Sequence, residues 1–241
     1  YTATDSSNNS ASVSRTVGVL GVKARILNVF TDGEIDPTWN EGFNGADSAI
    51  GWSECSNDGG EGCPNIAWAL VNDPDRGQVI QIEHSSAGQQ AIFYIKTGAP
   101  QNLSVYAGGQ VKFDIKTISG DSNYTMKIDC VYPCSSGDKA IGTVGLDGWE
   151  TVEFPVIDLV LGGLNLASVN TGLVIFPVAG QTDGVVYRLD NVEWKVPESP
   201  DSVAAEPGRF RMRSFCVLNS LAASSSRSSD PPEPSGLISN S

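Results

Sequence analysis

The sequence predicts an all-β protein, an antiparallel β-sandwich of the jelly-roll type. Short strand-like segments follow one another, polar glycine-containing turns separate them, and no amphipathic helix longer than two turns is convincing. Of the 241 residues 40% are hydrophobic, which is enough apolar material for a core. About eight strands in so short a body favour two packed sheets with jelly-roll connections.

The expected strands alternate between apolar and polar residues. In residues 110–118, Val111, Phe113 and Ile115 alternate with polar neighbours, which is the period of a strand with one buried face. Turn sequences such as Ser-Gly-Asp-Ser-Asn separate the segments. The segments predicted as strands are 79–84, 90–96, 110–118, 124–131, 150–155, 172–176 and 185–195.

Composition divides the chain into three parts. Residues 1–23 begin with an alternating, Ser- and Thr-rich stretch whose wording resembles the closing hairpin of bacterial immunoglobulin-like repeats, so we expect the end of an upstream linker domain. Residues 24–197 are the predicted jelly roll. Residues 198–241 are rich in Ser and Pro without a strand pattern, and we expect a disordered tail that is not native to the protein.

The charge and hydropathy of the chain exclude two classes of partner. Lys and Arg number 15 against 28 Asp and Glu, and the resulting net charge of −13 repels phosphate backbones, so no nucleic-acid partner is expected. No apolar run reaches the roughly 18 residues of a membrane span. The acidity suits an extracellular protein beside a neutral polymer, and equally a salty habitat.

Four of the five cysteines form two close pairs, Cys55 with Cys63 and Cys130 with Cys134. Neither pair has the spacing and second half of a zinc site, and the single histidine, His84, lies elsewhere. We therefore predict two local disulfides, an oxidising compartment and a secreted protein.

Two motifs at the ends of the predicted jelly roll carry a family resemblance. The opening motif is Asn-Val-Phe-Thr-Asp-Gly-Glu-Ile-Asp-Pro-Thr-Trp (28–39), and the closing motif is Val-Val-Tyr-Arg-Leu-Asp-Asn-Val-Glu-Trp (185–194). They resemble the first and last strands of jelly-roll carbohydrate-binding modules, which often open with "FEDG…W" and close with "YYIDNV". Within that superfamily the chain looks most similar to the galactose-binding-like C-terminal domain of marine exo-β-glucanases and to modules attached to laminarinases and agarases.

This resemblance implies a non-catalytic, monomeric module of a secreted polysaccharide-degrading enzyme, covalently linked to upstream domains. The implied ligand is a β-glucan such as laminarin, a β-1,3-glucan, or a related marine polysaccharide.

The same resemblance implies a structural calcium ion. In that superfamily the acid of the closing strand and an acid near the opening strand commonly share Ca²⁺, which prefers six to eight oxygen ligands. Asp190 matches the closing position, with Asp32 or Glu34 as its partner, although Thr31 stands where the family often has Glu. The alternative for Asp190 is an ordinary exposed acid before a turn.

An enzymatic site on the same fold is a competing hypothesis. Many jelly-roll β-glucanases place carboxylates in a Glu-x-Asp-x-x-Glu or Glu-x-Asp-x-Glu pattern on one strand. Here Glu34 and Asp36 are followed by Glu41, and Pro37 interrupts strand pairing, so the pattern is not met. A hydrolase or lyase with another site, and a structural or adhesion module stabilised by calcium, remain the alternatives.

Aromatic side chains could bind sugar because their rings stack on the C–H faces of pyranoses. Trp39, Trp52 and Trp68 flank the Cys55/Cys63 loop and are predicted to form a binding rim, or instead to plug the end of the sandwich. Trp149 and Trp194 are expected to be structural.

A sheet face offers a second predicted site, and a plain solvated face is its alternative. Tyr132, between Cys130 and Cys134, is predicted to present its ring at an edge. The residues predicted to share one polar face are Gln81, Glu83, Tyr94, Lys112, Lys127, Asp129 and Arg188.

Overall fold

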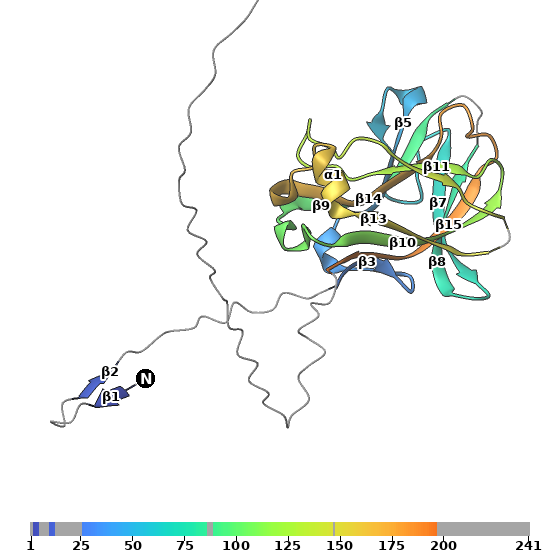
Figure 1. The fold of residues 1–241 in the computed structure, drawn as a ribbon. Helices are drawn as coiled ribbons and strands as arrows, with labels where there is room; N and C mark the ends of the chain where they lie inside the picture. Colours follow the sequence, from blue (N-terminus) through green and yellow to red (C-terminus); the bar gives the residue numbers. More distant parts are fainter. Residues whose placement is uncertain (1, 5–9, 13–25, 86–88, 147, 197–241) are drawn as a thin grey trace, which may run out of the picture. The chain divides into compact units, whose positions relative to one another are not determined.

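The structure, a computed structural model, describes residues 2–4, 10–12, 26–85, 89–146 and 148–196. The described residues between 26 and 196 form two antiparallel sheets that enclose a common apolar core, so the predicted all-β sandwich is confirmed. In Figure 1, strands β9, β11 and β14 of one sheet lie above β3, β10 and β15 of the other. The predicted tail 198–241 lies outside the described residues.

The first sheet has seven strands, in the order β13-β10-β15-β3-β4, with the β7–β8 hairpin also joined to β15. Several of its strands carry charged side chains that pair with one another. The strands are β3 (Ile26–Thr31), β4 (Glu34–Ile35), β7 (Ile66–Asp73), β8 (Gly77–His84), β10 (Gln110–Ser119), β13 (Glu150–Pro155) and β15 (Val186–Lys195).

The second sheet has six strands, in the order β12-β11-β14-β9-β5-β6. Short helices connect strands of the sandwich: α1 (Val156–Leu161), η1 (Pro37–Trp39), η2 (Ser48–Ile50), η3 (Ser104–Tyr106) and η4 (Leu166–Ser168). The strands are β5 (Gly42–Asp47), β6 (Ser53–Glu54), β9 (Ala91–Gln101), β11 (Asn123–Lys127), β12 (Lys139–Thr143) and β14 (Val169–Pro177).

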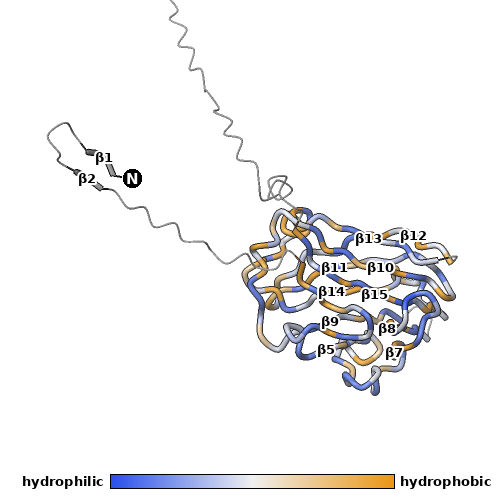
Figure 2. The backbone as a smooth tube through the Cα atoms, turned by 90° about the horizontal axis from the view of Figure 1, so that it is seen from below, coloured by the Kyte–Doolittle hydropathy of each residue, from blue (hydrophilic) through white to orange (hydrophobic). Residues whose placement is uncertain are grey.

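The seven predicted strand segments fall on strands β8, β9, β10, β11, β13, β14 and β15, but the predicted segment 124–131 runs beyond β11, which ends at Lys127. The alternation of apolar and polar residues predicted these strands because one face of each strand is buried in the core. Figure 2 shows hydrophobic and hydrophilic positions interleaved along the strands. Strands β5, β7 and β12 and the two-residue strands β4 and β6 were not predicted. In β5 the sequence Gly-Phe-Asn-Gly-Ala-Asp buries glycine and polar residues, which hides the periodicity.

The core between the sheets is closed by large aromatic side chains. Trp39 and Trp194 are fully buried, and the indole Nε1 of Trp194 donates to the carbonyl oxygen of Gly172 at 3.1 Å. A Cβ on Gly172 would lie 2.4 Å from a methyl carbon of Val29, so this glycine permits the close approach of the two sheets. The expectation that Trp194 is structural is therefore confirmed.

The N-terminal segment contributes two short strands, β1 (Thr2–Thr4) and β2 (Ser10–Ser12), which pair antiparallel. The remainder of residues 1–23 and its predicted immunoglobulin-like origin lie outside the described residues.

Strand β15 pairs with three strands. Along one side it pairs with β10 for most of its length, and on the other side Val186–Leu189 pair with β8 while Val192–Lys195 pair with β3. The change of partner falls at Asp190 and Asn191, where Asn191 has a left-handed backbone with φ of 50°. The opening and closing motifs of the sequence therefore meet at a branch point of the sheet.

His84, the single histidine, is buried at the end of β8. Its ring stacks on Tyr187 with centroids 5.9 Å apart, and neither ring nitrogen has a hydrogen-bond partner among the described residues. Burial lowers the pKa of His84 to about 4, although the negative charge of Asp47 offsets part of that effect.

The buried histidine predicts acid sensitivity. Because His84 ionises less readily in the folded state, the unfolded chain takes up the proton first as the pH falls below about 6.5. Stability is then lost between about pH 6.5 and pH 4, by about 3 kcal/mol on the scale of 1.4 kcal/mol for each pKa unit. Denaturant unfolding of the protein and of a His84→Leu variant across this pH range measures the effect. A variant with the same pH dependence as the parent would contradict the assignment.

Candidate functional site

The outward face of the six-stranded sheet contains two adjoining hollows of about 450 Å³ and 580 Å³. Trp52, Ile92 and Lys127 line both of them, so the two hollows form one open groove across the sheet. We call this surface the outer groove. The alternation of β9 explains part of it, since Phe93 and Ile95 enter the core while their neighbours face outward.

The floor of the outer groove is apolar. Its residues form a cluster separate from the sandwich core, and they come from adjacent strands: Val174 of β14 pairs with Tyr94 of β9, and Ile92 pairs with Ala46 of β5. An apolar floor inside a polar surface is typical of a ligand site. The members of this cluster that line the hollows are Ala46, Ile92, Tyr94 and Phe176, while Val174 is fully buried among them.

Polar groups on one side of the floor are linked to one another. The hydroxyl of Tyr94 donates to Glu54 Oε1 at 2.9 Å, and Lys96 Nζ donates to the same oxygen at 2.8 Å. Lys96 also lies 3.2 Å from Glu41 Oε2. The hydrogen bond from Lys96 holds the pKa of Glu54 below its usual range, against the effect of burial.

The other side of the groove carries a second ion pair, between Lys127 Nζ and Asp129 Oδ2 at 2.9 Å. The backbone amide of Asp129 donates to Thr171 Oγ1 at 2.7 Å, and this bond fixes the chain just after β11. Both lysines of the groove are thus held by carboxylates.

Two exposed aromatic rings border the groove. Trp52 is 52% exposed and follows Gly51, and both residues have left-handed φ values, which turn the chain outward between η2 and β6. Tyr132 is 92% exposed at the tip of the Cys130–Cys134 loop. Both rings line the same hollow.

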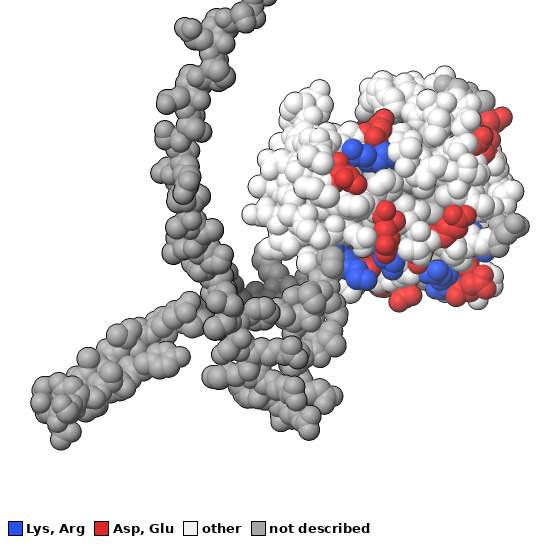
Figure 3. All heavy atoms as spheres, in the orientation of Figure 1, with Lys and Arg blue, Asp and Glu red and all other residues white. Residues whose placement is uncertain are grey.

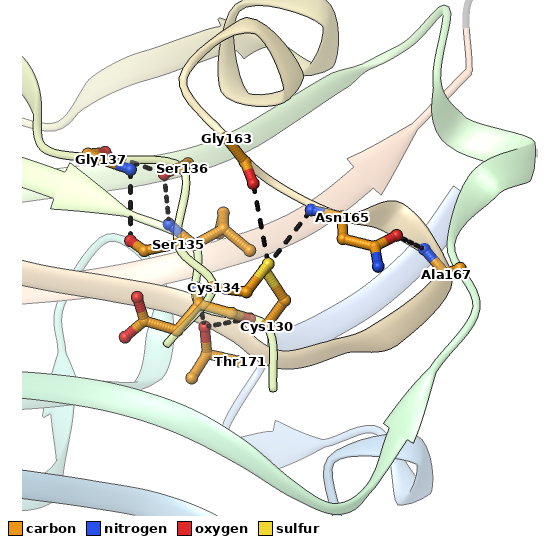
Figure 4. Close-up of a disulfide and its surroundings, with 11 residues drawn as sticks. Cys130, Cys134, Ser135, Ser136, Gly137, Gly163, Asn165, Ala167 and Thr171 are labelled. Atoms are coloured by element: carbon orange, nitrogen blue, oxygen red, sulfur yellow. Dashed lines mark hydrogen bonds between the residues drawn. A yellow bond between two sulfur atoms is a disulfide. The ribbon is translucent and has the colours of Figure 1, made fainter. Parts of the chain in front are cut away.

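The predicted disulfides are present, Cys55 with Cys63 and Cys130 with Cys134. Figure 4 shows the second one beside the segment Gly163–Ala167, where the backbone amide of Asn165 donates to Cys130 Sγ at 3.4 Å. The amide of Cys130 donates to the carbonyl oxygen of Cys134, and that of Val131 to Ser168. The base of the loop that carries Tyr132 is therefore fixed.

The structure separates the residues that were predicted to share one face. Tyr94, Lys127 and Asp129 lie in the outer groove, together with Tyr132 and Trp52. The prediction of a single face is wrong for the other four, because β8, β10 and β15 belong to the opposite sheet. These four residues are Gln81, Glu83, Lys112 and Arg188.

The three tryptophans predicted as a rim also divide. Trp39 is fully buried and Trp68 is 5% exposed, so both belong to the core and the rim prediction is wrong for them. Trp52 alone of the three is exposed. Trp149, expected to be structural, is half-buried: the guanidinium of Arg76 lies 5.0 Å from its ring centroid, and its Nε1 donates to Asp73 Oδ1 at 3.4 Å.

Several groove residues were not predicted. Ile92 and Phe176 lie in apolar runs that look like core in sequence, and Glu54 lies in a two-residue strand. The sequence did hold one indication of an apolar outward face. Residues 172–176 contain no polar side chain on either face, which indicates a strand that contacts other groups on both faces.

The outward face of the seven-stranded sheet is occupied by ion pairs. Asp73, 3% exposed, accepts from Arg188 Nη1 at 2.6 Å, and Arg188 Nε donates to Gln81 Oε1 at 2.9 Å. Arg76 donates to Asp114 Oδ2 at 2.6 Å. Burial opposes ionisation of Asp73, but hydrogen bonds from the Asp75 amide and Arg188 keep its pKa below the usual value.

These ion pairs connect the β7–β8 turn to strands β10 and β15. Gln81 and Arg188, which were predicted to bind sugar, have their polar groups engaged within the protein.

The residues predicted to bind calcium do not fit that ion as a set. Asp190 is 1% exposed, its Oδ1 accepts from the Asp32 amide at 3.3 Å, and its Oδ2 lies 3.8 Å from Arg76 Nη1. Asp32 and Glu34 have exposed side chains. Within the described ranges, no three His, Cys, Asp or Glu side chains are grouped to hold a metal ion. The alternative of an exposed acid at Asp190 is wrong. The expected calcium site is untested, and the arrangement of these side chains argues against it.

Several solved structures are similar in fold to this chain. The family 30 carbohydrate-binding module of a cellulosomal cellulase of Clostridium thermocellum is similar with a TM-score of 0.52 and 18% identity, over 72% of this chain and 99% of that chain. An exo-1,3/1,4-β-glucanase from a Pseudoalteromonas species has a TM-score of 0.53 and 13% identity, over 80% of this chain. The part of the enzyme that is matched is 24% of its own length.

The extra C-terminal domain of the same exo-glucanase, as a separate structure, has a TM-score of 0.51 and 12% identity over 71% of this chain and 93% of that domain. The fold inferred from the two end motifs is thereby confirmed. No protein-family model and no curated protein sequence matches the chain. In the described part, no helix has both the length and the apolar character needed to traverse a bilayer.

The ion pairs of the seven-stranded sheet predict a stability effect without a binding effect. Replacing Arg188 by Met leaves the buried carboxylate of Asp73 without its nearest cation, and we expect the free energy of unfolding to fall by about 3 kcal/mol. Lys112→Met is the matched control, since the Lys112–Glu193 pair is more exposed and worth less than about 1 kcal/mol. Denaturant unfolding measures both, and equal losses would contradict the assigned role of Arg188.

The Asp190 environment predicts that a chelator has little effect. Because Arg76 already supplies a positive charge beside Asp190, we expect thermal melting in calcium and in EDTA to agree within about 1 °C. A clear rise of the melting temperature in calcium, lost in an Asp190→Asn variant, would support the calcium site instead.

Proposed function

We propose that the chain is a non-catalytic carbohydrate-binding module that binds a β-glucan, such as laminarin, or a related polysaccharide in the outer groove. The observation that carries this proposal is an open groove with an apolar floor, bordered by the exposed rings of Trp52 and Tyr132. Rings stack on the apolar faces of pyranoses, and polar groups beside them bond the hydroxyls. The shared fold with the family 30 module supports the same function.

The positions of the carboxylates support a non-catalytic role. Asp36 accepts from the Thr38 amide and caps η1, while Glu41 pairs with Lys96. A glycosidase needs one carboxyl with a raised pKa to protonate the leaving group. Within the outer groove the pKa of Glu54 is lowered instead, and Asp129 is paired with Lys127.

We further propose that the module is secreted as a monomeric part of a larger polysaccharide-degrading protein, whose catalytic domain is elsewhere. The two disulfides support an oxidising compartment. The likeness to an extra C-terminal domain of an exo-glucanase supports attachment to an enzyme.

Ring removal tests the groove. Because Trp52 lines both hollows and Tyr132 only the first, we expect Trp52→Ala to weaken laminarin binding by about tenfold or more and Tyr132→Ala by less. Affinity electrophoresis in gels containing laminarin measures the dissociation constants. Leu161→Ala is the control, since Leu161 is 79% exposed on α1 and lines neither hollow.

The parent protein in the same assay separates the alternative functions. We expect retardation by laminarin without release of reducing sugar. Release of oligosaccharides would show a glycan-active enzyme. An absence of retardation by β-glucans, agar, alginate and carrageenan would favour a structural or adhesion module.

A further inference from the structure

The charged side chains of the outer groove form a pattern that bears on which polysaccharides can bind. Lys96 and Lys127 are the cations among its described lining residues, and each is within hydrogen-bonding distance of a carboxylate. Lys96 contacts two, Glu54 and Glu41. In Figure 3, basic atoms on the face drawn likewise lie beside acidic ones.

Carboxylates outnumber the cations in this surface. Asp138 also lines the second hollow, so each hollow has at least as many acids as lysines, and Glu41 adds a further negative charge beside Lys96. A sulfate or uronate in the groove would have to displace an existing ion pair or lie near an unpaired acid. The net charge of −13 adds a repulsive field around the whole molecule.

We propose that Glu54, Glu41 and Asp129 are specificity-determining residues: they cancel the two lysines and restrict the outer groove to neutral polysaccharides. This inference rests on the proposed carbohydrate-binding function. Neutral sugar hydroxyls can donate to the carboxylates and accept from the lysines without breaking either ion pair. Anionic polymers such as alginate or carrageenan offer acceptors only where donors are already engaged, and they bring like charges together.

The ion pair with Glu54 also fixes the floor. Tyr94 donates to the oxygen of Glu54 that accepts from Lys96, so one carboxylate holds both the ring of the floor and the cation at its side. Burial, followed by the charge of Glu54, raises the pKa of Tyr94, so the hydroxyl keeps its proton and remains a donor.

Neutralising the carboxylates should therefore create a binding site for anionic polymers. The variants are Asp129→Asn, which frees Lys127, and the double change Glu41→Gln with Glu54→Gln, which frees Lys96. Affinity electrophoresis in gels with laminarin, alginate or κ-carrageenan measures binding. We expect the parent protein to be retarded by laminarin alone, and each variant to gain at least about tenfold affinity for the anionic polymers, lost at high salt.

Matched controls remove the same number of negative charges from the opposite sheet. Glu83→Gln is the control for the single variant, and Glu83→Gln with Glu153→Gln is the control for the double variant, since both glutamates are exposed there. A similar gain in the controls would show an effect of net charge and would overturn the inference. Unchanged thermal melting of each variant shows that it is folded.

The remaining outcomes separate this inference from the proposed function. Retardation of the parent protein by alginate or carrageenan as well as laminarin would overturn the inference and leave carbohydrate binding standing. So would variants that keep laminarin binding and gain nothing on anionic polymers. A parent protein that binds no polysaccharide would overturn the proposed function and the inference with it.

Discussion

The arrangement of the sandwich depends on one strand that has to pair with three others. Strand β15 is hydrogen-bonded to β10 on one side and to both β8 and β3 on the other. Two strands can share one edge only if they diverge, and the left-handed backbone of Asn191 lies where they do. Asn191 donates to Asp114, and Thr31 donates to Asn191, so side chains hold the opening strand, the closing strand and β10 together at this point. The branch is what brings the β7–β8 hairpin and the β3–β4 hairpin into one sheet.

This constraint gives the two outward faces different properties. The seven-stranded sheet must hold a diverging hairpin, and the Asp73–Arg188 and Arg76–Asp114 pairs do so by linking the β7–β8 turn to β15 and β10. Those pairs engage the side chains of Asp73, Arg76, Asp114 and Arg188 within the protein. The six-stranded sheet has no branch, and its neighbouring strands pair in one continuous order. Its outward side chains are therefore available for an apolar floor, which explains why the groove is on this sheet.

Sequence reasoning predicted the strands well because a strand with one buried face leaves an alternating pattern in the chain. It could not assign strands to sheets, since the same alternation arises in either sheet. Lys112 and Lys127 occupy equivalent positions in their strands, yet they lie on opposite sides of the molecule. The prediction for the tryptophans was wrong for a related reason, since local composition does not distinguish a buried tryptophan from an exposed one. Trp39, at the end of η1, enters the core, whereas a left-handed turn directs Trp52 outward. The end motifs predicted that Asp190 lies beside Asp32 or Glu34, and the Asp32 amide does donate to it. The positive charge of Arg76 beside Asp190 comes from a turn that no local pattern connects with these residues.

The two disulfides illustrate how position can matter more than chain length. They close loops of 8 and 4 residues in sequence separation, and the loss of chain entropy on closing so short a loop is smaller than the roughly 3 kcal/mol of a 15-residue loop. Their effect on global stability is therefore modest, while each lies near one exposed ring of the outer groove. Cys55 follows Trp52 by three residues and its amide donates to Gly45 of β5, and Cys130–Cys134 fixes the base beneath Tyr132. Ordering a side chain on binding costs about 0.5 to 1.5 kcal/mol, so rings on loops that are already fixed retain more of the free energy of stacking. For a ligand held by a few rings and hydroxyl contacts, the ordering cost that is avoided is comparable to the binding free energy that one ring contributes. The rigidity of the segments that carry Trp52 and Tyr132 is therefore part of the site.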